Sequence, residues 1–380
     1  MFLYFPYNLL YVFCLLTRIF AGMKWLRVLY FIPLGFAFFF FSTPGFAQSL
    51  RSKKSLSVTY FNVDRLYDTS LSENSRDSLF TPHSVLQWDQ TRYQSKIQAI
   101  TQVLNQLHHQ NTPDILALTG FENQGVFLDL MKEYAPHPKK FQVVYDSASK
   151  TNYWGLQQAL IFNTKKLLLL HDTLLPIHFT IKGNKHRAQD LLHVQLLTRK
   201  GKDTLHVFIT ELDRDMPGSL ENFSVRRILN AQQISNRIRS IMAHKNHPYM
   251  ILGSFYEEPM SVLTLSVFNA VGVSDPRVHL SERVNISTEP LDSAILGTYH
   301  NEKQLLVADQ ALFSRSLYLN KKGWQYVHNS LFIDRSDWMI HPYPRYEGGP
   351  HSLYFREKYI GGFGSHYPIS FMLQYAKKRK

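Results

Sequence analysis

The stretch Met250-Ile-Leu-Gly-Ser-Phe-Tyr-Glu-Glu-Pro259 decides how this chain is interpreted. Residues 249–252 are apolar and favour a β-strand, and they stop abruptly at Gly253. A polar turn that is closed by Pro259 follows. A buried strand that ends in small and polar residues is typical of a sheet that delivers side chains to the mouth of a cleft.

The composition is that of a large globular domain. The chain has 380 residues, of which 44% are hydrophobic and 19% charged. Its formal net charge is +13 at pH 7, which suits phosphate-bearing or anionic-lipid partners but is also common without them. The only cysteine is Cys14, so no intrachain disulfide can form.

The first 47 residues have the pattern of a secretory signal peptide. A charged start at residues 23–27 precedes an apolar run at 28–41, and Gly45 and Ala47 supply the small residues of a cleavage site before Gln48. We expect translation to begin at Met23, with Met1 as the alternative. The predicted organisation is therefore a signal peptide at 1–47 and a single domain at 48–380. The mature protein is expected to be exported, periplasmic or secreted, with no stable transmembrane domain.

The mature chain reads as runs of strands with helices between some of them. Helical spacing of apolar residues predicts a helix at 92–108, and further helices are expected at 124–134 and 224–244. Strands are predicted at 56–61, 114–119, 143–145, 159–162, 165–170, 193–197, 205–210, 249–252, 305–307, 310–313 and 369–373. The pattern fits an α/β (α+β) fold in which two packed, mostly antiparallel β-sheets are flanked by helices, a four-layer α/β-sandwich.

Short motifs in a consistent order resemble the endonuclease/exonuclease/phosphatase superfamily, the deoxyribonuclease-like fold. Residues 250–259 resemble its G-D-F-N-(D/E)-(D/E)-P strand end. The other matches are residues 61–68 with (F/Y)-N-V-E-N-L-F-D, 80–93 with F-T-P…W…R-Y, 114–123 with P-D-I-I-G-L-x-E-V-E-N, 297–310 with G-T-Y…I-D-Q, and 359–368 with Y-L-G-G-Y-S-D-H-L-P.

The resemblance implies hydrolysis of phosphoesters with one or two Mg²⁺ ions, which an Asn, a Glu and other carboxylates would bind. Three family positions are retained: Asn62, Asp309 and His366. The positions at which the family residue is replaced are Gly120 (for the metal-binding Glu), Gln157, Thr210 and Glu211 (for Asn-His), Ser254 (for Asp), Tyr256 (for Asn) and Ser365 (for Asp). The loss of one positioned acid or base typically costs about 10²–10⁴ in rate.

Two functional hypotheses follow from this pattern. The favoured one is an exported, catalytically inactive member, a pseudoenzyme that acts as a binding or scaffold protein with no metal cofactor. Its candidate partners are a phosphate-bearing ligand or an envelope protein. The alternative is a Mg²⁺-dependent phosphodiesterase, nuclease or phosphatase whose metal ligands have moved to Asn62, Glu122 and Glu211. That arrangement requires Glu122 to lie on the same side of its strand as Gly120.

Overall fold

The computed structural model describes residues 54–72, 77–136, 140–145, 154–214, 223–245, 247–290, 297–300, 304–346 and 348–376. All of these residues fall within one unit, Leu50–Lys380. The predicted signal peptide at 1–47 and the proposed start at Met23 lie outside the described residues.

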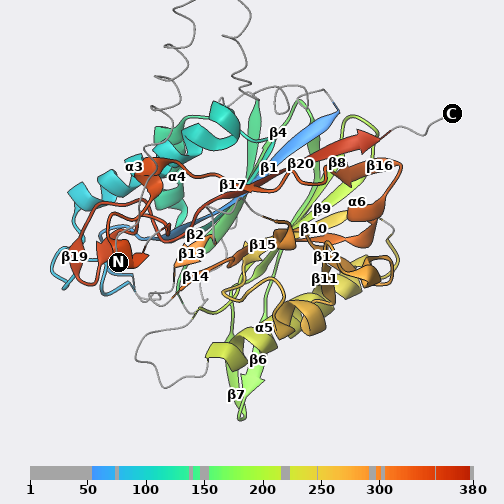
Figure 1. Ribbon diagram of the computed structural model, residues 1–380. Helices are drawn as coiled ribbons and strands as arrows, with labels where there is room; N and C mark the ends of the chain where they lie inside the picture. Colours follow the sequence, from blue (N-terminus) through green and yellow to red (C-terminus); the bar gives the residue numbers. More distant parts are fainter. Residues whose placement is uncertain are drawn as a thin grey trace, which may run out of the picture. The chain divides into compact units, whose positions relative to one another are not determined.

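The first β-sheet contains the N-terminal and C-terminal strands of the unit (Figure 1). Its order is β16-β20-β1-β2-β4-β3, and β17 also pairs with β20. Only β1 and β2 run parallel to each other. The strands are β1 (Ser55–Leu66), β2 (Ile115–Phe121), β3 (Phe141–Tyr145), β4 (Gln157–Asn163), β16 (Gly323–Tyr326), β17 (Phe332–Ile333) and β20 (Ile369–Ala376).

The second β-sheet has the order β11-β12-β15-β10-β9-β8-β5. Two of its pairings, β11 with β12 and β9 with β10, are parallel, and the others are antiparallel. The strands are β5 (Leu167–Leu175), β8 (Leu191–Thr198), β9 (Thr204–Glu211), β10 (Tyr249–Ser254), β11 (Ala270–Gly272), β12 (Arg283–Asn285) and β15 (Asp309–Ser314).

Helices cover the outer faces of the two sheets. Helices α3 (Gln90–Gln110) and α4 (Gln124–Tyr134) lie beside the first sheet, and α5 (Phe223–Met242) lies against the second (Figure 1). The fold also contains α6 (Arg315–Leu319) and three short two-stranded sheets: β6 (His178–Ile181) with β7 (Asn184–Arg187), β13 (Tyr299–His300) with β14 (Leu305–Leu306), and β18 (Tyr354–Phe355) with β19 (Lys358–Tyr359).

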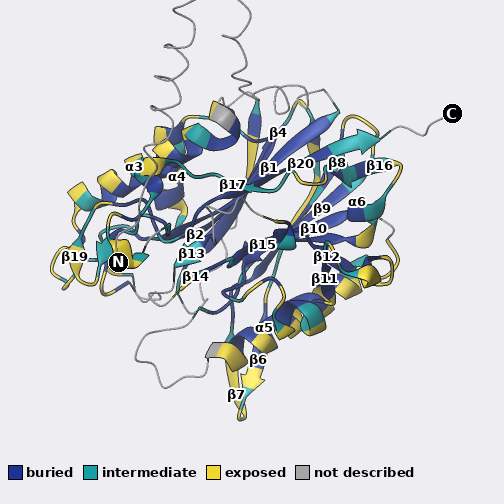
Figure 2. Ribbon diagram, in the orientation of Figure 1, coloured by how far each residue is buried: buried dark blue, intermediate teal, exposed yellow. Residues whose placement is uncertain are grey.

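The core lies between the sheets and under the helices (Figure 2). Side chains of the first sheet, such as Leu118, join those of the second sheet, such as Val207 and Phe313, in one buried cluster. On the outer face of the second sheet, Phe208 and Ile251 pack with Ile234 of α5. Because both faces of the central strands are buried, these strands are almost continuously apolar. The four-layer architecture and the mostly antiparallel pairing confirm the predicted fold class.

The predicted elements correspond to observed ones, with differences at their ends. The helix at 124–134 has the predicted bounds, whereas the strand predicted at 165–170 begins at Leu167 and continues to Leu175. The sequence predicted no strand for the hairpin of β6 and β7 or for the short strands β11–β13 and β16–β19. Elements this short carry little periodic signal of their own, and β12, β16 and β17 pair with strands that are far away in the chain.

Candidate functional site

Strand register places three polar side chains in one row across the second sheet. Ser254, the last residue of β10, is paired with Glu211 of β9 on one side and with Asp309 of β15 on the other. Residues that are paired directly across neighbouring strands point to the same face. The Ser254 hydroxyl donates a hydrogen bond to Asp309 Oδ1 at 2.5 Å.

Strand β1 of the first sheet brings Tyr60 and Asn62 to this row from the opposite side. The two residues are separated by one position, so their side chains share a face of the strand. Asn62 Nδ2 donates to Ser254 Oγ at 3.0 Å, and the Tyr60 hydroxyl lies 2.9 Å from the same oxygen. The serine hydroxyl thus has one acceptor and two neighbouring groups that can donate to it, which uses its full hydrogen-bonding capacity. Burial, followed by the charge of Asp309, raises the pKa of Tyr60 well above its ordinary value.

His366 approaches from the C-terminal segment through an isolated β-bridge between His366 and Tyr299. Its Nδ1 lies 2.9 Å from Asp309 Oδ2, and both side chains are fully buried. Within the described part of the chain, His366 Nε2 is buried and has no hydrogen-bond partner. The Tyr299 ring stacks on the imidazole at 4.6 Å between centroids. Asp309 and His366, two of the retained family positions, are therefore hydrogen-bonded to each other.

Tyr256 occupies the centre of the cluster. Its hydroxyl donates to Glu211 Oε1 at 2.6 Å and lies 3.5 Å from Asn62 Nδ2. Its ring packs edge-on against His366 and Tyr299, and the residue is only 6% exposed. Burial raises the pKa of Glu211, and burial together with the Glu211 charge raises that of Tyr256. A tyrosine ring therefore fills space beside Asn62 and His366.

Gly120, at the position of the family's metal-binding Glu, cannot simply be exchanged for a residue with a side chain. It has a φ of +87°, in the left-handed region that favours glycine. A Cβ atom there would lie 2.3 Å from Asn62 Oδ1 and 3.0 Å from the Asp64 nitrogen. The same Asn62 oxygen accepts a hydrogen bond from the Asp64 N–H at 2.9 Å. The amide oxygen of Asn62 thus occupies the space that a side chain at Gly120 would need.

A second charged group, centred on Asp64, lies beside the cluster, and Asp64 was not among the predicted site positions. Asp64 forms ion pairs with Arg214 at 3.1 Å and Arg65 at 3.4 Å, and Oδ2 accepts from the Ser365 N–H at 3.1 Å. Burial alone would raise the pKa of Asp64, but Arg65, Arg214 and Lys96 outweigh it and hold that pKa well below its usual range. The Asp64 carboxylate is therefore held in structural ion pairs with Arg65 and Arg214.

Three of the predicted positions lie outside the cluster. Glu122 Oε2 accepts from the Asp68 N–H at 2.8 Å, and burial raises the Glu122 pKa to about 8. Gln157 accepts a hydrogen bond from the Tyr145 hydroxyl. Thr210 precedes Glu211 on β9, so its side chain points to the other face of that strand.

The donor set does not fit a magnesium site of the kind that the resemblance implies. Strand β2 changes register at Gly120, so Glu122 leaves the face that Asn62 uses. Both Asp309 oxygens face His366, and the Asn62 oxygen is bonded to the backbone. In the ranges that the structure covers, no group of three or more His, Cys, Asp or Glu side chains is arranged to hold a metal ion.

Four residues of the site, Tyr60, Asp64, Arg214 and Tyr299, were missed from the sequence. The alternation of side chains along β1 would have placed Tyr60 beside Asn62, and Asp64 belongs to the motif at 61–68. Tyr299 belongs to the motif at 297–310, whereas no local pattern marks Arg214, which reaches the cluster through the tertiary fold.

Comparison with known proteins agrees with the fold. A family profile described as the endonuclease/exonuclease/phosphatase family matches residues 57–375. No curated protein sequence matches the chain. No helix among the described residues is long and apolar enough to cross a membrane.

Solved structures share the fold at low sequence identity. An endonuclease/exonuclease/phosphatase from Bacteroides vulgatus is 13% identical with a TM-score of 0.51, over 84% of this chain and 99% of its own. A family protein from Bacteroides thetaiotaomicron is 13% identical with a TM-score of 0.50, over 84% and 97%. A mannosyl-6-phosphatase from Bacteroides thetaiotaomicron VPI-5482 is 15% identical with a TM-score of 0.50, over 84% and 99%.

Proposed function

We propose that this chain, which belongs to the endonuclease/exonuclease/phosphatase family, is an exported member that binds a ligand or a protein partner without hydrolysing phosphoesters. The proposal has two separable parts, the loss of hydrolysis and the export. Each has its own test.

The loss of hydrolysis rests on one observation: the polar atoms at the centre of the site are bonded to one another. Asn62 donates to Ser254, Ser254 donates to Asp309, and Asp309 contacts His366. A hard cation such as Mg²⁺ needs several oxygen ligands at about 2.0–2.1 Å that are free to turn toward it. Here the side-chain oxygens of Ser254 and Asp309 are hydrogen-bonded within the cluster, and Gly120 has no carboxylate that could bind a cation.

The buried tyrosines support the same proposal. A phosphoester that reached His366 would have to displace Tyr256, whose hydroxyl bonds to Glu211 and whose ring packs against the imidazole. An ionised Glu211 would also repel a phosphate at this position. We infer that this cluster of Asn62, Ser254, Asp309 and His366 stabilises the junction between the two sheets, and that recognition takes place elsewhere on the molecule.

The runner-up function, phosphoester hydrolysis, is favoured by one feature of the site. Asp309 orients His366 through Nδ1, so Nε2 is directed away from the carboxylate, as in a general acid or base. This pair would support proton transfer if a phosphate could reach it.

Hydrolysis assays separate the two functions. The purified protein would be incubated with DNA or a chromogenic phosphodiester and with Mg²⁺, Mn²⁺ or Ca²⁺, and Mn²⁺ binding would be measured independently by electron paramagnetic resonance. We expect no turnover above that of His366→Ala and no tightly bound Mn²⁺. Turnover that is lost in Asn62→Ala or His366→Ala but kept in the surface control His279→Ala would reject the proposal.

Export is tested separately by sequencing the N-terminus of protein recovered from cells that express the full gene product. We expect the recovered chain to begin at Gln48, as the pattern at residues 23–47 predicts. Recovery of an uncleaved chain from the cell interior would contradict export and would leave the conclusion about hydrolysis untouched.

A further inference from the structure

A basic surface lies at the end of the two sheets that is opposite to the site described above. Strand β9 runs from Thr204 at this end to Glu211 in the site, and seven steps of roughly 3.3 Å place these residues about 23 Å apart. The turn before β9 packs on the end of β20, where the Tyr375 ring leaves no room for a Cβ on Gly201. The start of β1 lies at the same place, since the Tyr375 N–H donates to the Lys54 carbonyl oxygen at 2.8 Å (Figure 1).

Three neighbouring turns form this surface: residues 164–166 between β4 and β5, 199–203 between β8 and β9, and 320–322 between α6 and β16. The first two turns are joined by the Arg199 N–H, which donates to the Lys166 carbonyl oxygen at 2.8 Å. The third turn leads into Gly323, where a Cβ would lie 3.2 Å from Asp203 Oδ2 of the second turn. The side chains of all three turns therefore share one end of the molecule.

The three turns are strongly basic. They contain seven Lys or Arg residues and one acid, Asp203. One of the cations, Lys166, is neutralised by Asp114, whose carboxylate lies 2.6 Å from Nζ. The six others are all exposed, and none forms an ion pair with a residue that the structure describes: Lys165, Arg199, Lys200, Lys202, Lys321 and Lys322. These six residues define the basic surface.

The sequence continues from both ends of the described domain with further positive charge. Lys54 at the start of the domain follows Arg51-Ser-Lys53, and Ala376 at the end of β20 is followed by Lys377-Lys-Arg-Lys380. These two segments contain six cations and no acid, and both are joined covalently to the end of the molecule that carries the basic surface. The local excess of positive charge therefore exceeds that of the three turns alone.

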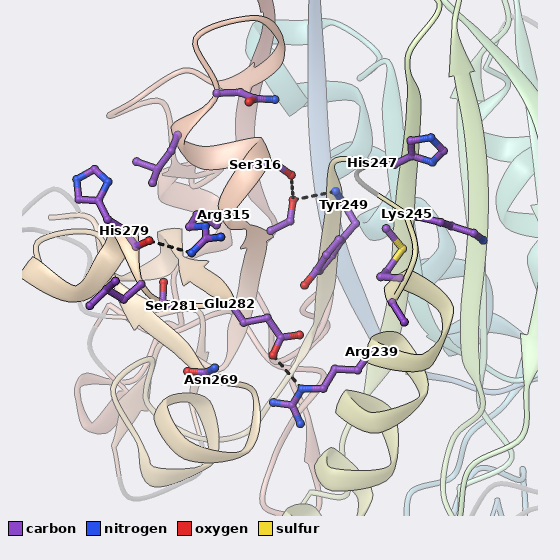
Figure 3. A pocket seen from close by; sticks show the side chains of 16 residues that line it. Arg239, Lys245, His247, Tyr249, Asn269, His279, Ser281, Glu282, Arg315 and Ser316 are labelled. Carbon is purple, nitrogen blue, oxygen red and sulfur yellow. Dashed lines mark hydrogen bonds and ion pairs between the residues drawn. The ribbon is translucent and has the colours of Figure 1, made fainter.

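A polar pocket of about 900 Å³ borders the basic surface but is not part of it. It lies at the start of β10, and Asn320 of the third turn is among its lining residues. Figure 3 shows the pairing of Arg239 with Glu282, at 2.9 Å. It also shows Arg315, which donates to the His279 carbonyl oxygen at 2.8 Å. Both guanidinium groups are thus held within the pocket wall.

From this arrangement we propose that the basic surface docks the protein on a membrane that carries anionic lipid headgroups. Clusters of roughly four to eight Lys or Arg residues are typical of proteins that bind such membranes. A charged membrane attracts cations that are spread over a flat area, so the six side chains need not converge on one point. Screening limits this attraction to about 8 Å at physiological salt, which favours cations that are gathered at one end of the molecule.

The connection of the chain favours a membrane over a nucleic acid as the partner. The predicted signal peptide at 1–47, which would direct the chain to a membrane, joins the domain through Lys54 at this same end. The docked domain would hold the site at the other end of β9 away from the bilayer. The inference does not depend on whether the protein hydrolyses phosphoesters.

Vesicle binding tests the proposal. The chain that begins at Gln48 would be used, since Leu50–Lys380 forms a compact unit of its own. Cosedimentation would be measured with vesicles of phosphatidylglycerol, which is anionic, and with vesicles of phosphatidylcholine, which carries no net charge. We expect binding to phosphatidylglycerol that weakens as the salt concentration rises, and no binding to phosphatidylcholine.

The surface variant removes four of the six cations: Lys200→Gln/Lys202→Gln/Lys321→Gln/Lys322→Gln. One cation near an anionic membrane strengthens binding about fivefold, so the surface variant should bind phosphatidylglycerol vesicles at least roughly tenfold more weakly than the wild type. The two pairs of substitutions would also be made separately, so that the test stands if the fourfold variant does not fold.

The control variant removes the same charge at exposed positions elsewhere: Lys182→Gln/Lys185→Gln/Arg345→Gln/Lys358→Gln. Lys182 and Lys185 belong to the hairpin of β6 and β7, which lies far from the end of β20 (Figure 1). The control variant should bind as the wild type does. Equal binding of the surface variant and the control variant would overturn the proposal, as would wild-type binding that is absent or that does not distinguish the two lipids.

Duplex DNA is the competing partner, because it also attracts a basic surface. Its binding to the same proteins would be measured by fluorescence anisotropy. We expect the surface variant to lose vesicle binding. If it instead loses DNA binding and keeps vesicle binding, the basic surface is a nucleic-acid site and the membrane proposal is wrong.

Discussion

Three histidines on the second sheet form a hydrogen-bonded chain that makes the fold sensitive to acid. His193 Nε2 lies 2.8 Å from His206 Nδ1, and His206 Nε2 lies 3.1 Å from His247 Nδ1. The first two imidazoles are buried, at 2% and 0% exposure, whereas His247 is exposed. Burial, with a smaller contribution from neighbouring positive charge that includes Lys245, lowers the pKa of His193 to about 4 and that of His206 to about 3.

The sign and size of the effect follow from these values. A histidine in the unfolded chain has a pKa near 6.5. As the pH falls, the unfolded chain therefore binds protons at His193 and His206 that the folded chain does not bind. The stability that the neutral imidazoles provide is present above pH 6.5 and is lost as the pH falls toward 4. A shift of 2.5 pKa units corresponds to about 3.4 kcal/mol. The exposed His247 gives solvent access to one end of the three-histidine chain, so solvent screening reduces this free energy. We expect the free energy of unfolding of the wild type to fall by about 2–3 kcal/mol on account of His193 and His206 together between pH 7.5 and 4.5.

The assay compares the wild type with His193→Gln/His206→Gln, which cannot titrate. Free energies of unfolding would be taken from urea denaturation at pH steps from 7.5 to 4.5. Because other groups titrate in both proteins, the measured quantity is the difference between them, which should shrink by about 2–3 kcal/mol as the pH falls. His178→Gln, at an exposed position, should follow the wild type. A difference that stays constant within about 0.5 kcal/mol would refute the reasoning.

Three further substitutions test the packing around the site. Gly120→Ala should lower the free energy of unfolding, measured by urea denaturation, by about 2–3 kcal/mol. The left-handed backbone of Gly120 and its contact with Asn62 leave no room for a Cβ. An unchanged free energy of unfolding would mean that the strand relaxes. Asp64→Asn should cost about 2–4 kcal/mol, because the charge of Arg214 then loses its partner, and an unchanged melting temperature would contradict this. Burial raises the pKa of Asp334 to about 7, so the wild type loses stability as the pH rises from about 4 to 7. Relative to the wild type, Asp334→Asn should become more stable by about 2–4 kcal/mol in free energy of unfolding as the pH rises over this range. Stability–pH profiles that run parallel in the two proteins would exclude this effect of Asp334.

Local patterns were sufficient for the main elements of secondary structure. Alternating apolar residues predicted β1, helical spacing predicted α3, and the polar turn after β10 marked Ser254 as a position near a cleft. These features depend on the period of side chains along a single segment, which the sequence contains in full.

The sequence by itself determined the family, the two-sheet architecture and the identities of the substituted site positions. Only the tertiary structure decided what those substitutions do. The left-handed conformation of Gly120 moves Glu122 off the face of Asn62, and the positions of Tyr256 and Tyr299 bury His366. The physical reason is that a metal site or a phosphate site depends on where oxygens converge in space. That convergence is set by register, bulges and packing between segments far apart in the chain, none of which has a local signature.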